Sequence, residues 1–337
     1  MNSSSRASEI AESSDQVEVQ FNGPGKVATS KILQTYPIPS ALNSAIVLLQ
    51  LSLVASAFFM LARVDGVAQL LLLAFYFGLV MNAVYSTIHE AHHRILFKNR
   101  RLNDAVGVSL SLFFPAPFHL LRQGHIGHHR RNRSDDEAFD LYFDRDKRWW
   151  KYLAWYGILT GVYWVVVVLA NLILLFLPKL FDPKIWRWDR TAAVFLEHFS
   201  PESFLVMRLE ALAAVLLQAT LFWLVDVPWS YYVTMYFGFG LMWSSLQYVH
   251  HYQAERDVLD GAKNLHLNKP VDLFWMNHNL HQTHHQLPTV PWCYLPKVAE
   301  LKRTKTSQLL GAYLQMWKGP KHAEEHVVNK YQGEVSR

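Results

Sequence analysis

The sequence is poor in cysteine and in charge. Its 337 residues include one cysteine, Cys293, which excludes a disulfide framework and any zinc, rubredoxin-like or iron–sulfur site built from cysteine pairs within the chain. Charged residues make up 18% of the sequence, against about 25% in ordinary soluble domains, and this shortfall disfavours a purely soluble protein. Hydrophobic residues make up 51%, too many for intrinsic disorder over most of the length.

Long uncharged runs are what the chain has instead. A helix needs about 20 apolar residues to cross a bilayer, and several runs reach that length: residues 41–62, 67–88 and 152–177, and two more within 211–249, on either side of a break at Asp226 and Pro228. A weaker run, 105–121, contains two prolines. A soluble helical core is disfavoured, because such runs leave no face for water.

These runs predict an all-α membrane protein with at least four transmembrane helices and a helical cap on the cytoplasmic side. The cytoplasmic side follows from the lysines and arginines that flank the runs. Residues 1–40 are polar and lack a signal-peptide pattern, so we expect a cytoplasmic tail there. We expect a membrane catalytic domain over residues 41–320 and a short tail over 321–337.

One run leaves two paths open. Residues 152–177 are uncharged, which favours a full crossing, but basic residues stand on both sides of the run, which favours a re-entrant or in-plane path. If 41–88 and 211–249 each form a hairpin, a full crossing by residues 152–177 would place the clusters described next on different sides of the membrane, unless residues 105–121 are also more than interfacial.

Histidines concentrate in four short clusters. These are His89, His92 and His93; His125, His128 and His129; His281, His284 and His285, with His278 upstream; and His250 and His251. Residues four apart share a helix face, so His89 and His93 can reach one metal ion, while His92 points elsewhere. The second and third clusters each offer three imidazoles at the spacing i, i+3 and i+4. The isolated histidines are more typical of ordinary polar contacts near a membrane surface; they are His119, His198, His266, His322 and His326.

The clusters supply nine candidate metal ligands, namely His89, His93, His125, His128, His129, His251, His281, His284 and His285. A closed zinc site takes four ligands, so nine imidazoles indicate two ions. Imidazole suits zinc, copper, iron and nickel alike, and spacing does not separate iron from copper. Two redox-active ions beside an apolar interior suit the activation of O₂ for attack on an unreactive C–H bond. Zinc is unsuitable for this chemistry. The first cluster alone also fits the H-E-x-x-H pattern of zinc proteases. A protease site would leave the other clusters without a metal-binding role.

Polar residues near the clusters are candidates for a supporting role. Metal-bound histidines usually donate their second N–H to a carboxylate or carbonyl, and we assign Glu90 and Asp136 to this role, with Asp135, Glu137 and Asp140 as further candidates. The alternative is that these acids balance neighbouring arginines. Gln247, one turn before His251, either holds a water near the metal or makes a helix contact.

The three histidine boxes resemble those of the integral-membrane fatty acid desaturase and hydroxylase superfamily. His89–His93 is similar to that family's H-[D/E]-x-x-H box, and His125–His129 and His281–His285 are similar to its two H-x-x-H-H boxes. His251 resembles the family's extra ligand, with Gln247 where an asparagine is common. The resemblance covers about residues 41–296 and implies that the nine histidines hold two iron ions.

The same resemblance implies O₂-dependent oxidation of a fatty acyl chain. Desaturation is the leading hypothesis, with hydroxylation, or oxidative decarboxylation to a terminal alkene, as the alternative. The substrate is expected to be a long-chain fatty acid or an acyl thioester. A metal transporter and a non-catalytic lipid-binding protein are alternatives of other classes, but a transporter would place its ligands along the spans.

The sequence contains no haem-binding His-Pro-Gly-Gly stretch and no dinucleotide fingerprint. We therefore expect a separate electron donor, a ferredoxin or a cytochrome b5-like protein, docking on the basic cytoplasmic face. The other expected partners are membrane lipids, and no nucleic acid is expected.

Overall fold

The computed structural model describes residues 32–337, apart from 198, 327–328, 332 and 334–337. Residues 1–31, most of the expected N-terminal tail, and His198 lie outside the described residues. The described chain is mostly helical, which confirms the all-α prediction. Its strands are two short parallel pairs, β1 (Leu141–Tyr142) with β4 (Lys321–His322) and β2 (Asn264–His266) with β3 (Thr306–Gln308).

Three helices are long and apolar enough to cross a membrane: α3 (Ser40–Leu61), α4 (Val67–His92) and α10 (Phe204–Val225). Two bent helix pairs raise the number to five if each pair is counted as one span, a range that includes the predicted minimum of four. Helix α10 begins at Phe204, before the predicted residue 211, and includes Arg208 and Glu210. Helix α11 (Trp229–Leu246) follows the expected break, where Asp226 adopts a left-handed conformation, but α11 is not among the helices long and apolar enough to cross a membrane.

Both bent pairs correspond to runs that the sequence had left ambiguous. Run 105–121 becomes α5 (Arg100–Phe113) and α6 (Phe118–Arg131), bent by 104°, because the prolines at 115 and 117 cannot continue a helix. Run 152–177 becomes α7 (Arg148–Leu159) and α8 (Val162–Phe176), bent by 90° at Gly161. Gly161 has a φ of +87°, which glycine adopts without strain. The run is therefore not one straight helix.

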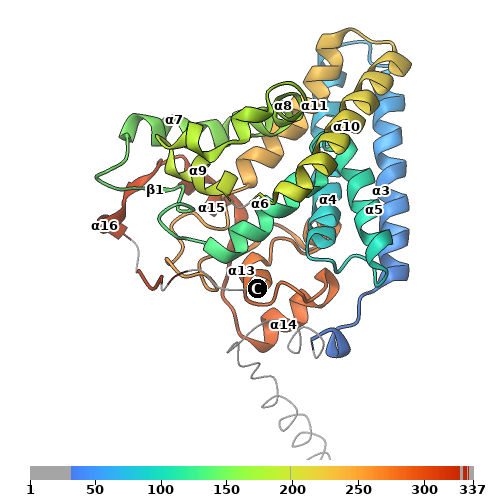
Figure 1. Ribbon diagram of the computed structural model, residues 1–337. Coiled ribbons are helices and arrows are strands. Elements are labelled where there is room, and N and C mark those ends of the chain that lie inside the picture. The colour runs from blue at the N-terminus through green and yellow to red at the C-terminus, as the bar shows by residue number, and fades with distance from the viewer. Residues whose placement is uncertain (1–31, 198, 327–328, 332, 334–337) are drawn as a thin grey trace, which may run out of the picture.

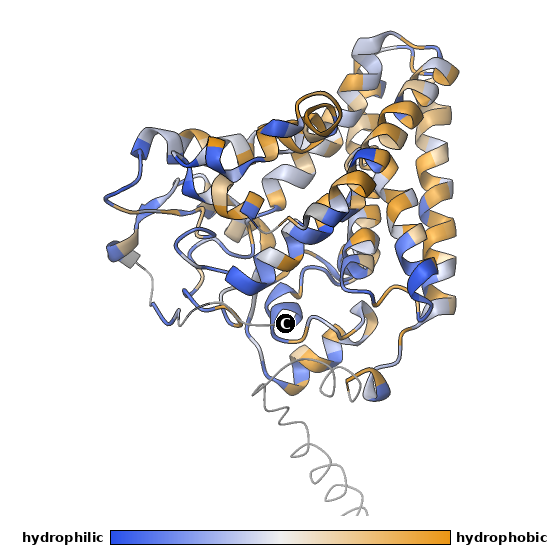
Figure 2. Ribbon diagram, in the orientation of Figure 1, coloured by the Kyte–Doolittle hydropathy of each residue, from blue (hydrophilic) through white to orange (hydrophobic). Residues whose placement is uncertain are grey.

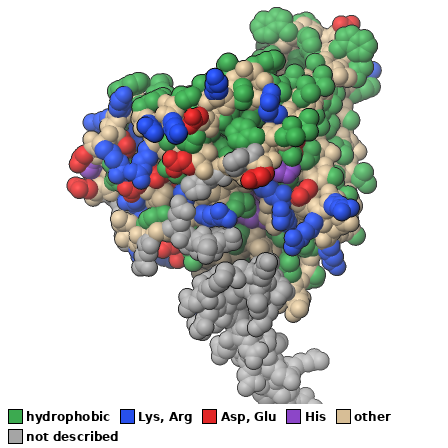
Figure 3. All heavy atoms as spheres, viewed as in Figure 1, with side chains coloured by type: hydrophobic (Ala, Val, Ile, Leu, Met, Phe, Trp, Pro, Cys, Tyr) green, Lys and Arg blue, Asp and Glu red, His purple; other side chains and the backbone are tan. Residues whose placement is uncertain are grey.

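The long helices stand side by side on the right of Figure 1, whereas α7, α8 and α9 (Arg190–Glu197) lie to their left and α13 (His281–Gln286) and α14 (Leu295–Leu301) lie below. Hydrophobic residues dominate the upright helices in Figure 2, and Figure 3 shows hydrophobic side chains over the upper right of the molecule, with charged ones over the left and the middle. The remaining helices are short: α12 (Lys269–Phe274), α15 (Leu309–Met316) and α16 (Ala323–His326). That the cap faces the cytoplasm stays a prediction.

Both ends of the described chain contact other segments of the protein. Ile32 and Tyr36, within the expected N-terminal tail, are buried against Leu287 and Val290. Residues 321–322 of the expected C-terminal tail form β4.

Helices α4 and α11 approach closely through small residues. A Cβ atom added at Gly238 of α11 would lie 2.7 Å from the Cβ of Ala74 and 2.9 Å from its carbonyl oxygen. Small residues allow helix backbones to pack this closely in membranes. Because α4 carries the first histidine cluster and α11 leads to His251, this contact sets their relative position.

Gly238→Ala is expected to lower the thermal denaturation midpoint of the protein in detergent micelles. The added methyl group overpacks the α4–α11 contact, at a cost of about 1–3 kcal/mol. Gly311→Ala in α15 is the matched control, because a Cβ there meets nothing within 4 Å, and helix propensity predicts a gain of up to about 1 kcal/mol. Equal midpoints for the two variants would show that the close contact is not needed.

Candidate metal centre

Four separate segments deliver histidines to the end of the helix bundle where α4 stops. The last turn of α4 carries the first cluster, α6 the second and α13 the third. His251 lies in the turn after α11. The side chains therefore meet although up to 196 residues separate them, from His89 to His285.

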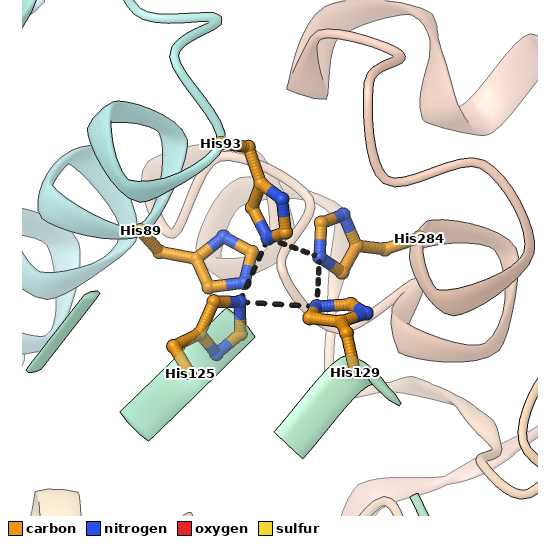
Figure 4. Close-up of side chains that lie close together, drawn as sticks. All are labelled: His89, His93, His125, His129 and His284. Atoms are coloured by element: carbon orange, nitrogen blue, oxygen red, sulfur yellow. Dashed lines mark hydrogen bonds between the residues drawn. The ribbon is translucent and has the colours of Figure 1, made fainter. Parts of the chain in front are cut away.

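The first group contains His89, His93, His125, His129 and His284. Four of its Nε2 atoms form a closed ring, drawn in Figure 4. The Nε2 of His125 is 2.7 Å from that of His93 and 3.0 Å from that of His129, and the Nε2 of His284 is 3.1 Å from each of the same two atoms. The fifth ring, His89, is buried, and its Nε2 has no hydrogen-bond partner among the described residues.

The second group contains His128, His251, His281 and His285. Its contacts again join Nε2 atoms: His251 is 3.2 Å from His128 and 3.1 Å from His281, and His281 is 3.2 Å from His285. The two groups adjoin one another, since the rings of His129 and His285 stack with their centroids 4.2 Å apart.

The groups divide each box in a regular way. Residues at i and i+4 stay together, as His125 with His129 and His281 with His285, whereas the i+3 member, His128 or His284, joins the other group. Neighbouring residues on a helix point about 100° apart, so adjacent histidines can serve adjacent sites. The three imidazoles of the second box, and likewise those of the third, are therefore divided between the two groups.

The donor set fits two metal ions. Nitrogens bound at about 2.0–2.1 Å to one ion lie roughly 2.9–3.4 Å from each other, close to the spacings of both groups. A ring nitrogen has one in-plane position, for either a proton or a lone pair. Several ring nitrogens turned toward one point, as in Figure 4, are thus suited to a shared cation. Nitrogen-only ligation by imidazole suits iron, copper, zinc or nickel.

Hydrogen bonds on the far side of two rings orient them. The Nδ1–H of His251 donates to the carbonyl of Gly261 at 2.8 Å, and the Nδ1 of His128 lies 3.4 Å from a carboxylate oxygen of Glu137. Both contacts leave the lone pair on Nε2, facing the group. Burial acts to raise the pKa of Glu137, but hydrogen bonds from His128 and Arg131 outweigh it and hold that pKa below its usual range.

Burial also keeps the neighbouring histidines neutral. It lowers the pKa of His251 and of His281 well below the usual value, and nearby histidines lower both further. His250 and His278 flank the groups without joining them, and burial lowers their pKa values to about 4 and about 3. Neutral imidazole is the form that binds metal.

The carbonyl of Gly261 is a functional group that reasoning from sequence missed. A Cβ at this position would lie 2.1 Å from the carbonyl oxygen of Asp257 and 2.4 Å from Cγ of Arg133, so only glycine fits. The one local signal is the turn-forming pattern of Asp257, Asp260 and Gly261.

The polar residues assigned to supporting roles have other neighbours in the structure. Glu90 accepts a hydrogen bond from the backbone N–H of Trp292 at 3.1 Å, and Asp136 pairs with Arg190 at 2.6 Å. Gln247 donates to the carbonyl of Trp243, which is the helix-contact alternative. Glu137, another of the candidate acids, lies against His128 of the second group.

The remaining histidines whose side chains the structure describes lie outside both groups. His92 is buried against Phe118, with ring centroids 5.2 Å apart. His119, His266 and His322 contact carboxylates instead, in agreement with ordinary polar roles. Nothing is described for the side chain of His326.

A buried polar network ties the end of α6 to the segment that carries His251. Arg133 pairs with Asp140, donates to the hydroxyl of Tyr248 at 2.8 Å and donates to the carbonyl of Ala254 at 2.9 Å. Both side chains of the ion pair are 0% exposed. The network therefore holds two ligand-bearing segments at a set separation.

Aromatic rings cover the centre on the side of the long helices. Tyr85, one turn before His89, packs against Phe114, Trp243 and His278 at centroid distances of 5.5, 5.3 and 6.0 Å. Phe114 and Trp243 are buried, so these rings form an apolar layer that His278 joins to His89 of the first group.

Comparison with known protein families finds one described as fatty acid desaturase, which matches residues 66–318. The matched region is more than half of the chain and contains all nine histidines of the two groups. A search of curated proteins found no match.

Proposed function

The chain belongs to the fatty acid desaturase family, and from this premise we propose that it is an O₂-dependent di-iron oxidoreductase that acts on a fatty acyl chain, most simply a desaturase. The observation that carries the proposal is the pair of histidine groups, five and four residues, at the end of apolar helices. A metal transporter would need ligands distributed along a path, whereas these groups share one end.

The nine histidines would hold the two ions, His89, His93, His125, His129 and His284 around one and the other four around its neighbour. When bound, iron would supply the redox chemistry by which O₂ oxidises an unactivated C–H bond. Gly261 and Glu137 hold two of the rings in the tautomer that faces the ions. The nearly complete burial of His89, His251 and His285 excludes bulk water.

The acyl chain is proposed to approach from the side of the long helices, next to the buried apolar layer of Tyr85, Phe114 and Trp243. This layer is apolar and lies close to the first group, which suits a hydrocarbon and not a polar peptide. A protease built on the H-E-x-x-H pattern is disfavoured, because His89 and His93 share their group with three further histidines. The position of the substrate carbon decides between desaturation, hydroxylation and decarboxylation.

Mass analysis of products tests the proposal. Cells that make the protein receive a uniformly ¹³C-labelled saturated fatty acid, and cells that make the His284→Ala variant at the same level serve as the control. The expected product has lost two hydrogens and is absent from the control. Gain of one oxygen, or loss of the carboxyl carbon, would replace desaturation by one of the alternatives. Identical lipids in both cultures, with two irons bound in the purified wild type, would contradict the proposed class.

A further inference from the structure

The two ends of the uncharged run 152–177 meet in the structure. Trp150 lies just before the run and Trp188 lies after it, and their rings are 5.3 Å apart. The Nε1–H of Trp150 also donates to Asp189 at 2.9 Å. A full crossing would separate the two ends by about 30 Å, the thickness of the hydrocarbon core, and residues 178–187 contain four charged side chains, which disfavours a second crossing there. The run therefore returns to the side from which it starts.

Helix α8, the second half of this run, exposes one apolar face. The helix contains no charged residue, and its exposed apolar residues recur three or four positions apart, at Val162, Val166, Leu169, Leu172 and Phe176. Trp164, Asn171 and Leu174 are buried on the opposite face. The exposed face therefore suits contact with lipid acyl chains and not with water.

A row of tryptophan rings lies where the two ends of the run meet. Consecutive rings in this row have centroids 5.8, 5.3 and 5.9 Å apart, in the order Trp149, Trp150, Trp188 and Trp186. Trp149 is 65% exposed and Trp188 is 51% exposed. Tryptophan combines an apolar ring with a polar N–H group, and it is enriched in the headgroup layers of membranes.

The segments that carry these rings are also basic. Residues 147–151 and 179–190 contain seven lysines and arginines. Two acids within these segments, Asp182 and Asp189, and two acids paired with them, Asp136 and Asp146, leave an excess of three positive charges. Lys184 and Arg187 are exposed and form no ion pair with any residue that the structure describes. In Figure 3, lysine and arginine side chains gather over the left of the molecule, where α7 and α9 lie in Figure 1.

We propose that this Trp–basic surface, residues 147–151 and 179–190, lies in the headgroup layer and binds anionic phospholipid, with the exposed face of α8 against the acyl chains. The excess of positive charge favours a headgroup with a net negative charge over a zwitterionic one. The neighbouring apolar face favours a lipid surface over a soluble acidic protein. The inference is independent of the proposed function, because the surface contains none of the nine histidines.

A fluorophore at residue 185 tests the proposal in the full chain, as Ile185→Cys with Cys293→Ser, in phosphatidylcholine nanodiscs. The probes are doxyl-labelled phosphatidylglycerol and doxyl-labelled phosphatidylcholine at equal mole fraction, and the measurement is quenching of the fluorophore. Both lipids are expected to quench, phosphatidylglycerol more strongly. Lys184→Glu with Arg187→Glu should lower the preference for phosphatidylglycerol by about fivefold or more, and added salt should weaken it.

The matched control is Arg303→Glu with Lys305→Glu, the same change of charge at two exposed residues on the turn before β3. A retained preference for phosphatidylglycerol in this control supports the assignment. Absence of quenching by both lipids would overturn the proposal, since it would place the surface in water, where a soluble protein could dock. Equal quenching by the two lipids without the glutamate substitutions, or an unchanged preference in Lys184→Glu with Arg187→Glu, would also overturn it. None of these measurements depends on acyl oxidation.

Discussion

His251→Ala is expected to reduce the iron content of the purified protein from about two ions per chain to about one and to abolish acyl oxidation. His251 contacts two other members of the four-histidine group through Nε2. Its loss leaves three ligands for that ion, while the five-histidine group stays complete. Elemental analysis of the purified variant and mass analysis of its products measure the two effects.

His266→Ala is the control for this experiment. His266 contacts Asp272, its side chain is 43% exposed, and it belongs to neither group, so iron content and turnover should remain at the wild-type level. If His251→Ala retained both ions and full turnover, the assignment of the second group would be wrong. Loss of both ions would instead show that the two sites fill together.

Arg133→Met is expected to be among the most destabilising single substitutions in the chain. It leaves the carboxylate of Asp140 buried without its cation, and both side chains are 0% exposed in the pair. Removing one partner of such a pair costs about 3–5 kcal/mol. Because the same guanidinium contacts Tyr248 and Ala254, a weaker hold on iron should accompany the lower denaturation midpoint.

Arg145→Met tests whether burial is the reason. Arg145 pairs with Asp135, but the two side chains are 48% and 39% exposed, and exposed pairs contribute about 0–1 kcal/mol. A second substitution, Asp140→Leu, should recover part of the stability lost in Arg133→Met, because it removes the unpaired charge. Equal denaturation midpoints for Arg133→Met and Arg145→Met would contradict the role given to the buried pair.

The apolar runs predicted where helices form better than where they bend. Runs 41–62 and 67–88 became α3 and α4 nearly as expected, because neither run contains a proline to interrupt a helix. Residues 152–177 look like one crossing by composition, yet they bend by 90° at Gly161. A Cβ at Gly161 would lie 3.2 Å from the Cα of Leu241 in α11, so the bend depends on a helix about 80 residues away.

By itself, the sequence determined the helical architecture, the residue type of every candidate ligand and the pairing of histidines four apart. Each of these follows from local chemistry, since hydropathy and helical periodicity act within one segment. Tertiary structure decided that His128 and His284 belong to the other group, that Gly261 and Glu137 contact the rings of His251 and His128, and that Glu90 and Asp136 contact Trp292 and Arg190. These outcomes depend on how separate helices pack in space. The spacing of residues within one helix does not determine that packing.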